Sequence, residues 1–303
     1  MISSPEETTG SPVPVILDTD IGDDIDDTWA LAMLLGLPKK IDLKLIVTST
    51  GNTPEKTRLT AHILERAGRT DIPIATGVKT SAAAHNQLAW VGDWDIGGYS
   101  GEVIDDGVAA LTDAVNTSRE PVTILAIGPQ TNLAEALRRD PAIAGNARVV
   151  AMAGSIHLGY RDSPEPANEY NIRADVEAAR EVLAADWENT WTPLDTCGSL
   201  LLSGESYAAV SDSSSLLSRI VIENYDAWAN RADHPPDASS VLFDTVAAYL
   251  SFDERFLKVE TVRIEIDDDG FTRRAPSGAP LRAALSWRNR SAFEALLVEA
   301  LQA

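Results

Sequence analysis

Cysteine is almost absent from this chain of 303 residues, which contains only Cys197. A single cysteine excludes an internal disulfide framework, and it fits a reducing cytoplasm. The chain also lacks any uninterrupted apolar run long enough for a membrane helix. Its first twelve residues, MISSPEETTGSP, lack the basic start and apolar core of a secretion signal. We therefore expect a cytoplasmic protein whose residues 1–12 form a disordered tail.

Basic residues are scarce as well. The chain has 25 Lys and Arg, only six of them Lys, against 46 Asp and Glu, which gives a net charge of −21. This charge repels nucleic acid and anionic membranes, and no cluster of Lys or Arg interrupts it. A solvated acidic surface is the simplest interpretation. We favour a more specific one, adaptation to high salt, because screening makes such self-repulsion tolerable.

Short apolar runs alternate with helical patterns along the chain. This alternation predicts an α/β fold, in which helices flank a mostly parallel, open, Rossmann-like sheet. A chain of this length could form one domain or two, but we find no boundary and predict a single domain over residues 13–303. Strands are expected at 13–17, 43–48, 72–75, 122–126, 148–152, 257–266 and 282–286. Helices are expected at 26–35, 54–66, 105–116, 132–138, 175–184, 204–210, 215–229 and 240–250, and at the C-terminus.

Polar clusters follow four of the apolar runs, at 18–27, 50–52, 128–132 and 154–171. In open parallel sheets, ligands bind beyond the carboxyl ends of the strands. The four clusters are therefore expected to face one crevice.

The first cluster is the most unusual. The stretch VILDTDIGDDIDDTWAL, residues 15–31, places six aspartates within ten positions. Carboxylates this close stay ionised only if a positive charge neutralises them. An oxygen-only set suits a hard cation, and irregular carboxylate geometry suits Ca²⁺ better than Mg²⁺. The spacing is not that of an EF-hand, and an acidic helix cap would explain only one or two of the six. We predict a metal site here.

Five motifs between residues 13 and 250 resemble, in order, those of the nucleoside hydrolase family. They are VILDTDIGDDIDDTWAL, VTSTGN, ILAIGPQTNLAEAL, the pair VVAMAGS and PANEYNIRADVEAA, and VLFDTVAAY. The resemblance implies a nucleoside hydrolase-type α/β domain that uses Ca²⁺ to hydrolyse the N-glycosidic bond of ribonucleosides, giving ribose and a free base in nucleoside catabolism. It also suggests a homodimer or homotetramer.

The resemblance implies a role for each matching residue. Asp20 would bind Ca²⁺ and take a proton from a calcium-bound water. The other metal ligands would be Asp27, the backbone carbonyl of Thr131, and Asp244. The ribose would be held by Asp26, Asn52, Glu169 and Asn171, with Glu169 on the 5′-hydroxyl.

The register of the aspartates leaves a choice. The family has one residue between the glycine and the paired aspartates, whereas Asp23, Asp24 and Ile25 intervene here. Counting forward from Asp20 favours Asp24 as a ligand or ribose contact. Counting back from TWAL favours Asp26 and Asp27, which we prefer because this pair begins the helix, while Asp24 stays in the predicted site.

These residue types suit the reaction. Cleavage of an N-glycosidic bond passes through an oxocarbenium-like state, and carboxylate and amide oxygens stabilise its positive charge more than they stabilise the neutral ground state. A metal-bound water beside a carboxylate base supplies hydroxide character near neutral pH.

Two departures from the family concern the leaving base and the 5′-hydroxyl. Phe243 stands where many members have a histidine that can assist the leaving base, and the loop 159–167 lacks the family's pattern. His85, His157 and His234 lie in loops and are expected to be solvated. Trp90 and Trp94, in a polar Gly-rich loop, are the tryptophans that we expect to stack on a nucleobase.

Two other functions stay open on sequence alone. The DTD motif also resembles the nucleophile loop of haloacid-dehalogenase-like phosphatases. The paired aspartates lie too early for that family's downstream acidic pair, however, and Lys79 is the nearest basic candidate. A non-catalytic, calcium-dependent nucleoside or ribose sensor is the second alternative, and Phe243 is the feature in its favour.

Overall fold

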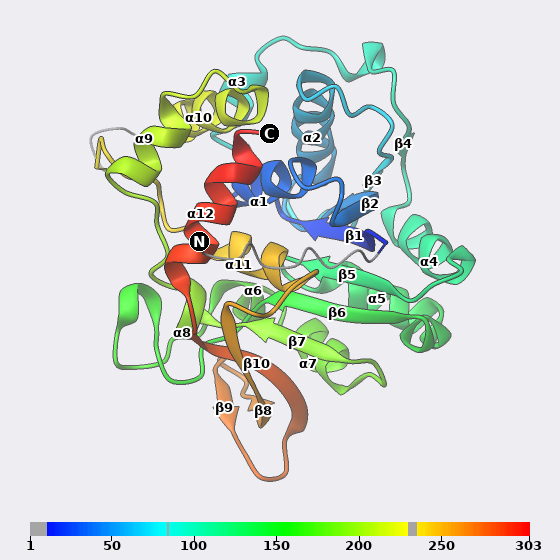
Figure 1. Cartoon of the computed structure of the whole chain (residues 1–303). Coiled ribbons are helices and arrows are strands. Elements are labelled where there is room, and N and C mark those ends of the chain that lie inside the picture. The colour runs from blue at the N-terminus through cyan, green and yellow to red at the C-terminus, as the bar shows by residue number, and fades with distance from the viewer. Residues whose placement is uncertain (1–10, 84, 230–234) are drawn as a thin grey trace.

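The computed structural model describes residues 11–83, 85–229 and 235–303. Within them, the strands form one ten-stranded sheet in the order β4-β3-β2-β1-β5-β6-β7-β10-β8-β9 (Figure 1). Neighbouring strands from β4 to β10 are parallel, whereas β8 pairs antiparallel with β10 and β9. The predicted fold class is confirmed, with an antiparallel edge added to it. The strands are β1 (Val13–Thr19), β2 (Ile41–Thr48), β3 (Ile74–Thr76), β4 (Val103–Ile104), β5 (Val122–Ala126), β6 (Ala147–Met152), β7 (Asn189–Thr192), β8 (Leu257–Ile266), β9 (Thr272–Arg274) and β10 (Ala279–Trp287).

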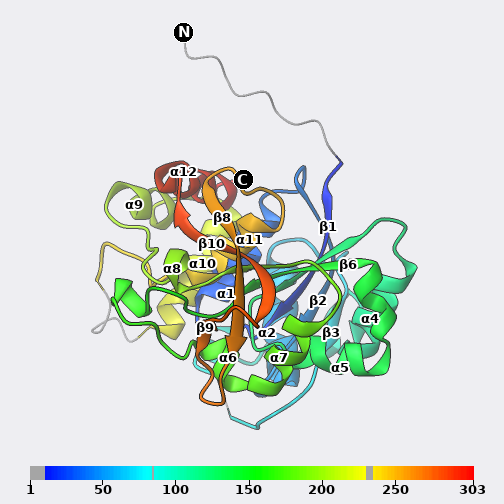
Figure 2. The ribbon, with the colours of Figure 1, turned by 90° about the horizontal axis from the view of Figure 1, so that it is seen from below.

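Helices cover both faces of the sheet (Figures 1 and 2). Alternate residues of β1 point to opposite faces, so Val15 and Leu17 join one buried core and Ile16 the other. The first core is covered by α1 (Asp26–Leu35), α2 (Thr53–Arg66), α3 (Leu88–Val91), α8 (Leu194–Cys197), α9 (Glu205–Ser211), α10 (Leu216–Trp228), α11 (Phe243–Leu250) and α12 (Arg290–Leu301). The second is covered by α4 (Gly107–Thr117), α5 (Thr131–Arg139), α6 (Tyr170–Ala174) and α7 (Val176–Ala184). Short 3-10 helices lie at Ile96–Gly98, Pro141–Gly145 and Tyr160–Asp162.

The strand order explains where a ligand can bind. From β1 the chain builds outward through β2, β3 and β4, then returns to the other side of β1 as β5 and continues to β6 and β7. The order of the strands therefore reverses between β1 and β5, and such a switch point leaves a crevice at the carboxyl ends of the two strands. The aspartate cluster follows β1 at this place.

Two predictions about the chain's organisation remain partly or wholly untested. A single sheet that includes strands from Val13 to Trp287 agrees with one domain over 13–303, but that division stays a prediction. Most of the predicted tail, residues 1–10, lies outside the described residues.

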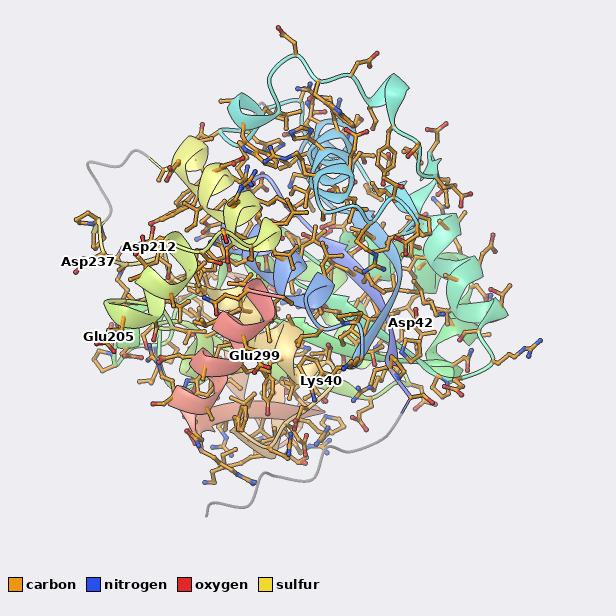
Figure 3. All side chains as sticks on the ribbon, turned by 45° about the horizontal axis from the view of Figure 1, so that its top comes forward. Lys40, Asp42, Glu205, Asp212, Asp237 and Glu299 are labelled. Carbon is orange, nitrogen blue, oxygen red and sulfur yellow. The ribbon has the colours of Figure 1, made fainter. Side chains whose placement is uncertain are left out.

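The surface carries the excess of acidic groups. Figure 3 shows Asp42, Glu205, Asp212, Asp237 and Glu299 on the outside of the molecule. Among the helices that the structure describes, none has the length and apolar character needed to cross a membrane.

Candidate functional site

The turn after β1 determines which way the aspartate side chains point. Gly22 has a φ of +106°, a conformation that side chains with a Cβ rarely adopt, and it allows the chain to reverse between β1 and α1. Ile21 and Ile25 anchor the turn because both are fully buried in the core. With the isoleucines facing inward, four aspartates of the turn and of the start of α1 line a cavity: Asp20, Asp24, Asp26 and Asp27.

Three carboxylates from distant segments meet in this cavity. One oxygen each of Asp26, Asp27 and Asp244 lies within 4.8 Å of the other two, and all three residues are buried. The backbone N–H of Asp244, at the start of α11, donates to Asp26 Oδ2 over 3.0 Å, which ties α11 to α1. The hydroxyl of Thr19 donates to Asp27 Oδ1. The register that pairs Asp26 with Asp27 is therefore the one that forms a cluster.

Burial disfavours the ionised forms of four acidic groups, Asp20, Asp26, Asp27 and Asp244. It raises the pKa of Asp20 to about 8, opposed by the positive charge of Lys56. Burial, and then the charges of neighbouring aspartates, raise the pKa of Asp26, Asp27 and Asp244 well above the usual value. No Lys or Arg of the described residues forms an ion pair with these four carboxylates. A buried, oxygen-only group with excess negative charge fits a hard divalent cation.

Two polar residues from the α6 segment form the next part of the cavity. Glu169 caps α6, and its carboxylate accepts hydrogen bonds from the backbone N–H groups of Gly154, Asn171 and Ile172 at 2.7–3.2 Å. Burial raises the pKa of Glu169 to about 7 against these bonds. Asn171 Nδ2 donates to the carbonyls of Ile127 and Met152 at 3.2 and 3.0 Å. Both side chains are thereby fixed at the cavity wall.

Aromatic residues complete the lining. Tyr160, Tyr170 and Phe243 line the cavity together with the polar groups. The rings of Tyr160 and Phe243 meet edge to face, with centroids 5.9 Å apart, and the Tyr160 hydroxyl accepts from the backbone N–H of Tyr170. The cavity therefore combines an acidic, a polar and an aromatic part. Sequence reasoning missed both tyrosines: Tyr160 lies in the loop 159–167, which matched no motif, and Tyr170 lies within PANEYNIRADVEAA but was assigned no role.

Two predicted site residues lie elsewhere. Thr131 begins α5, its hydroxyl donates to Asp175 Oδ2 over 2.7 Å, and it does not line the cavity. Ile127, directly after β5, does line it. Asn52 caps α2 at the end of β2, is only partly buried, and also lies outside the cavity lining. The cavity lining therefore includes the residue directly after β5 and not Thr131 at the start of α5.

Four of the residues that the sequence singled out, His85, His157, Trp90 and Trp94, do not line the cavity. His85 Nδ1 lies 2.8 Å from Asp23 Oδ1, and the half-exposed His157 pairs with Asp195 over 3.0 Å. His234 lies outside the described residues. Trp90 and Trp94 pack around His62 of α2, with ring centroids at 4.7 and 5.1 Å, so the structure does not place them where they could stack on a ligand of this cavity.

Known proteins are similar to this chain in sequence and in fold. The chain is 33% identical over 208 residues to the non-specific ribonucleoside hydrolase RihC of Klebsiella pneumoniae. This aligned region covers 65% of this chain and 66% of that protein. It is 36% identical over 182 residues to the pyrimidine-specific ribonucleoside hydrolase RihA of Escherichia coli, and this aligned region covers 56% of each protein. The chain thus matches less than two thirds of the length of either relative. A plant nucleoside hydrolase, the PpNRh1 enzyme, has the same fold, with a TM-score of 0.83 at 24% identity over 96% of this chain and 99% of that one.

A family model covers nearly the whole described chain. It matches residues 15–291, a range that includes every residue of the acidic, polar and aromatic parts of the cavity. The model is described as inosine-uridine preferring nucleoside hydrolase. The chain therefore belongs to the inosine-uridine preferring nucleoside hydrolase family.

Proposed function

We propose that this protein hydrolyses the N-glycosidic bond of ribonucleosides and that Ca²⁺ is its cofactor. The observation that carries the proposal is the buried carboxylate cluster of Asp26, Asp27 and Asp244. It shares one cavity with Asp20, Glu169 and Asn171. Membership of the family supports a ribonucleoside as the substrate, and both named relatives are ribonucleoside hydrolases.

We assign the calcium ligands to the carboxylates of Asp20, Asp27 and Asp244, with Asp26 beside them. The backbone carbonyl comes from Ile127 and not from Thr131, because only Ile127 lines the cavity. Bound calcium would lower the pKa of a coordinated water and orient the ribose hydroxyls.

We assign the remaining steps of the reaction to individual residues of the cavity. Asp20 accepts the proton of the attacking water, and Asp24, Asp26 and Asn171 orient the ribose diol. Glu169 accepts a hydrogen bond from the 5′-hydroxyl. Together these oxygens surround the anomeric carbon as it becomes positive, and they stabilise that state more than the neutral nucleoside. A ribose contact from Asn52 stays a prediction.

The aromatic part faces the leaving base in this arrangement. Tyr160, Tyr170 and Phe243 offer ring surface on which a flat nucleobase can stack. Their chemistry is compatible with purines and pyrimidines alike.

The test compares nucleosides with a phosphate ester. Purified protein is incubated with inosine, uridine and p-nitrophenyl phosphate, before and after removal of calcium by a chelator and again after calcium is restored. Free base and ribose are expected only in the calcium form, with no phosphate release. The Asp20→Asn variant should lower kcat by roughly 10²–10⁴-fold, the range of general acid–base catalysis, with little change in KM.

Other results would contradict the proposal. Turnover that survives both the chelator and Asp20→Asn removes calcium and Asp20 from the reaction. Protection from unfolding by nucleosides without any turnover supports the sensor instead. The phosphatase alternative has lost its support, because the chain belongs to another family and Lys79 is exposed outside the cavity. Assembly into dimers or tetramers and a cytoplasmic location stay predictions.

A further inference from the structure

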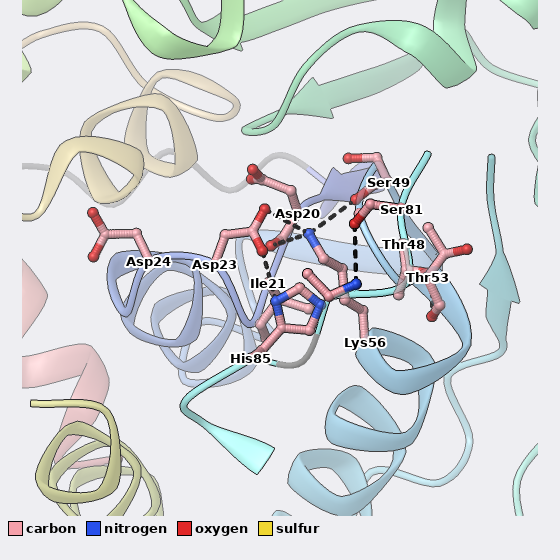
Figure 4. Close-up of polar contacts among 12 residues, drawn as sticks. Asp20, Ile21, Asp23, Asp24, Thr48, Ser49, Thr53, Lys56, Ser81 and His85 are labelled. Carbon is pink, nitrogen blue, oxygen red and sulfur yellow. Dashed lines mark hydrogen bonds and ion pairs between the residues drawn. The ribbon is translucent and has the colours of Figure 1, made fainter. Parts of the chain in front are cut away.

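Lys56 is a lysine with no exposed surface, close to the carboxylate cluster. It belongs to the first turns of α2, and its ammonium donates three hydrogen bonds (Figure 4): to the backbone carbonyl of Asp20 at 2.8 Å, to Asp23 Oδ2 at 2.9 Å and to the backbone carbonyl of Ser49 at 3.2 Å. An ammonium has three N–H donors, so its hydrogen-bonding capacity is fully used. Lysine is almost never fully buried unless it is paired, which makes this arrangement costly to build.

These bonds connect the ends of two neighbouring strands. Asp20 follows β1 and Ser49 follows β2, and the two strands are paired in the centre of the sheet. The packing around the lysine stem is tight, because a Cβ added at Gly51 would lie 3.2 Å from Lys56 Cε. Lys56 therefore holds the main chain of Asp20 while the Asp20 carboxylate points away from it toward the cavity (Figure 4).

Asp23 supplies the counter-charge. Its second oxygen lies 2.8 Å from His85 Nδ1, so both carboxylate oxygens are engaged on the side away from the cavity. Figure 4 shows Asp23 turned toward Lys56 and His85, whereas Asp24 points away from them. Asp24 lines the cavity and Asp23 does not. The pair Lys56–Asp23 thus decides which of two adjacent aspartates faces the cavity.

We propose that Lys56 is a positioning residue of the metal centre, which, through Asp20 and Asp23, fixes the turn 20–24 in the geometry that calcium binding requires. The proposal rests on the calcium site assigned above. A turn that is already fixed before the ion binds loses less conformational entropy on binding, which is the general advantage of preorganisation. Loss of Lys56 also removes one hydrogen-bond donor each from two backbone carbonyls and from the Asp23 carboxylate.

The test measures calcium binding directly. Lys56→Met removes the ammonium but keeps an unbranched side chain of similar length, and calcium affinity is measured by titration calorimetry on protein whose folding is checked by circular dichroism. We expect affinity to fall at least about tenfold, which corresponds to about 1.4 kcal/mol, and kcat at saturating calcium to fall with KM little changed. Lys44→Met, at an exposed lysine within β2, is the matched control for the loss of one positive charge and should bind calcium like the wild type.

If Lys56→Met does not fold, Lys56→Gln keeps two N–H donors at this place and should show a smaller loss in the same direction. A folded variant that binds calcium as tightly as the wild type, or more tightly, overturns the proposal, whatever happens to its melting temperature. Absence of calcium binding by the wild-type protein would instead be a failure of the proposed function.

Discussion

Phe243 and Asp244 are neighbours at the start of α11, and both line the cavity with different chemistry. Asp244 joins the carboxylate cluster, and Phe243 packs against Tyr160 in the aromatic part. No His, Lys or Arg of the described residues lines the cavity. The hydroxyl groups of Tyr160 and Tyr170 are poor acids at neutral pH, because burial raises the pKa of each to about 12. Neither Phe243 nor the two tyrosines can therefore readily supply a proton to a leaving base at neutral pH.

This arrangement makes a prediction about Phe243→His. A histidine here could protonate the leaving base, so the variant should hydrolyse inosine at least about tenfold faster near pH 6, a cautious figure for general acid catalysis. Turnover of p-nitrophenyl riboside, whose leaving group needs no proton, should stay the same. Kinetics with both substrates check this. Phe243→Leu, which adds no acid, is the control and should show no gain. Equal acceleration of both substrates would point to a changed ribose site and contradict the argument.

Helix α4 offers a prediction about pH at the level of one element. Asp106 caps its N-terminus: Oδ1 accepts from the backbone N–H of Ala109 at 3.0 Å, and Arg139 donates to both oxygens. The Ala109 N–H, and Arg139 after it, hold the pKa of Asp106 below its usual value in spite of partial desolvation. Asp106→Ala should therefore lower the free energy of unfolding by about 1 kcal/mol at pH 7, as loss of a cap does.

The sign of the pH effect follows from the lowered pKa. The folded state holds the ionised carboxylate more favourably than the unfolded chain, so the stabilisation is complete above the unfolded pKa of 3.8 and is lost as the pH falls through the lower folded value. The difference between the wild type and Asp106→Ala should be constant from about pH 5 to pH 8 and shrink below about pH 4 in denaturant titrations. Asp106→Asn, which keeps an acceptor for Ala109, should retain most of the cap. An undiminished difference near pH 3 would show that charge is not involved.

Elements with a clear apolar pattern could be predicted from the sequence, and those defined by tertiary contacts could not. Helix α1 was expected at 26–35 and lies at Asp26–Leu35. Strand β8 spans the predicted 257–266 and alternates exposed and buried residues from Thr261 to Ile266. Strand β7, Asn189–Thr192, was missed because NTWT is mostly polar. All four residues are nevertheless buried between β6 and β10, and Asn189 Nδ2 donates to the carbonyl of Val182.

In the candidate site, too, groups that the residue type reveals could be predicted, and groups defined by tertiary contacts could not. The function of acidic side chains such as Asp26, Asp27 and Asp244 follows from the residue type, which the sequence shows directly. Their motifs therefore indicated the cluster correctly. The backbone carbonyl that we assign to Ile127 could not be recognised in this way, because every residue has a backbone carbonyl and only the position directly after β5 distinguishes this one. The role of Lys56 was also invisible, since its three acceptors come from segments that only the sheet brings together.

At the scale of the whole molecule, the net charge of −21 acts on stability in two opposite ways. Many arginines form surface ion pairs with acidic groups, such as Arg282 with Glu188 and Glu254. Each exposed pair contributes only about 0–1 kcal/mol, and salt weakens it. The unpaired excess repels itself over the whole surface, and salt weakens that repulsion too. Because the chain has 46 acidic and only 25 basic residues, we expect the repulsion to affect stability more than the ion pairs do.

We therefore expect the free energy of unfolding to rise when KCl increases from about 0.1 M, where the Debye length is about 10 Å, to 1 M, where it is about 3 Å. Denaturation with urea at constant calcium measures it without changing the metal centre. Glu205→Lys with Glu299→Lys, two exposed positions labelled in Figure 3, makes the net charge less negative and should reduce the dependence on KCl. Stability that is unchanged or falls with KCl in the wild type would mean that the surface ion pairs outweigh the repulsion, and the acidic composition could then no longer be attributed to adaptation to salt.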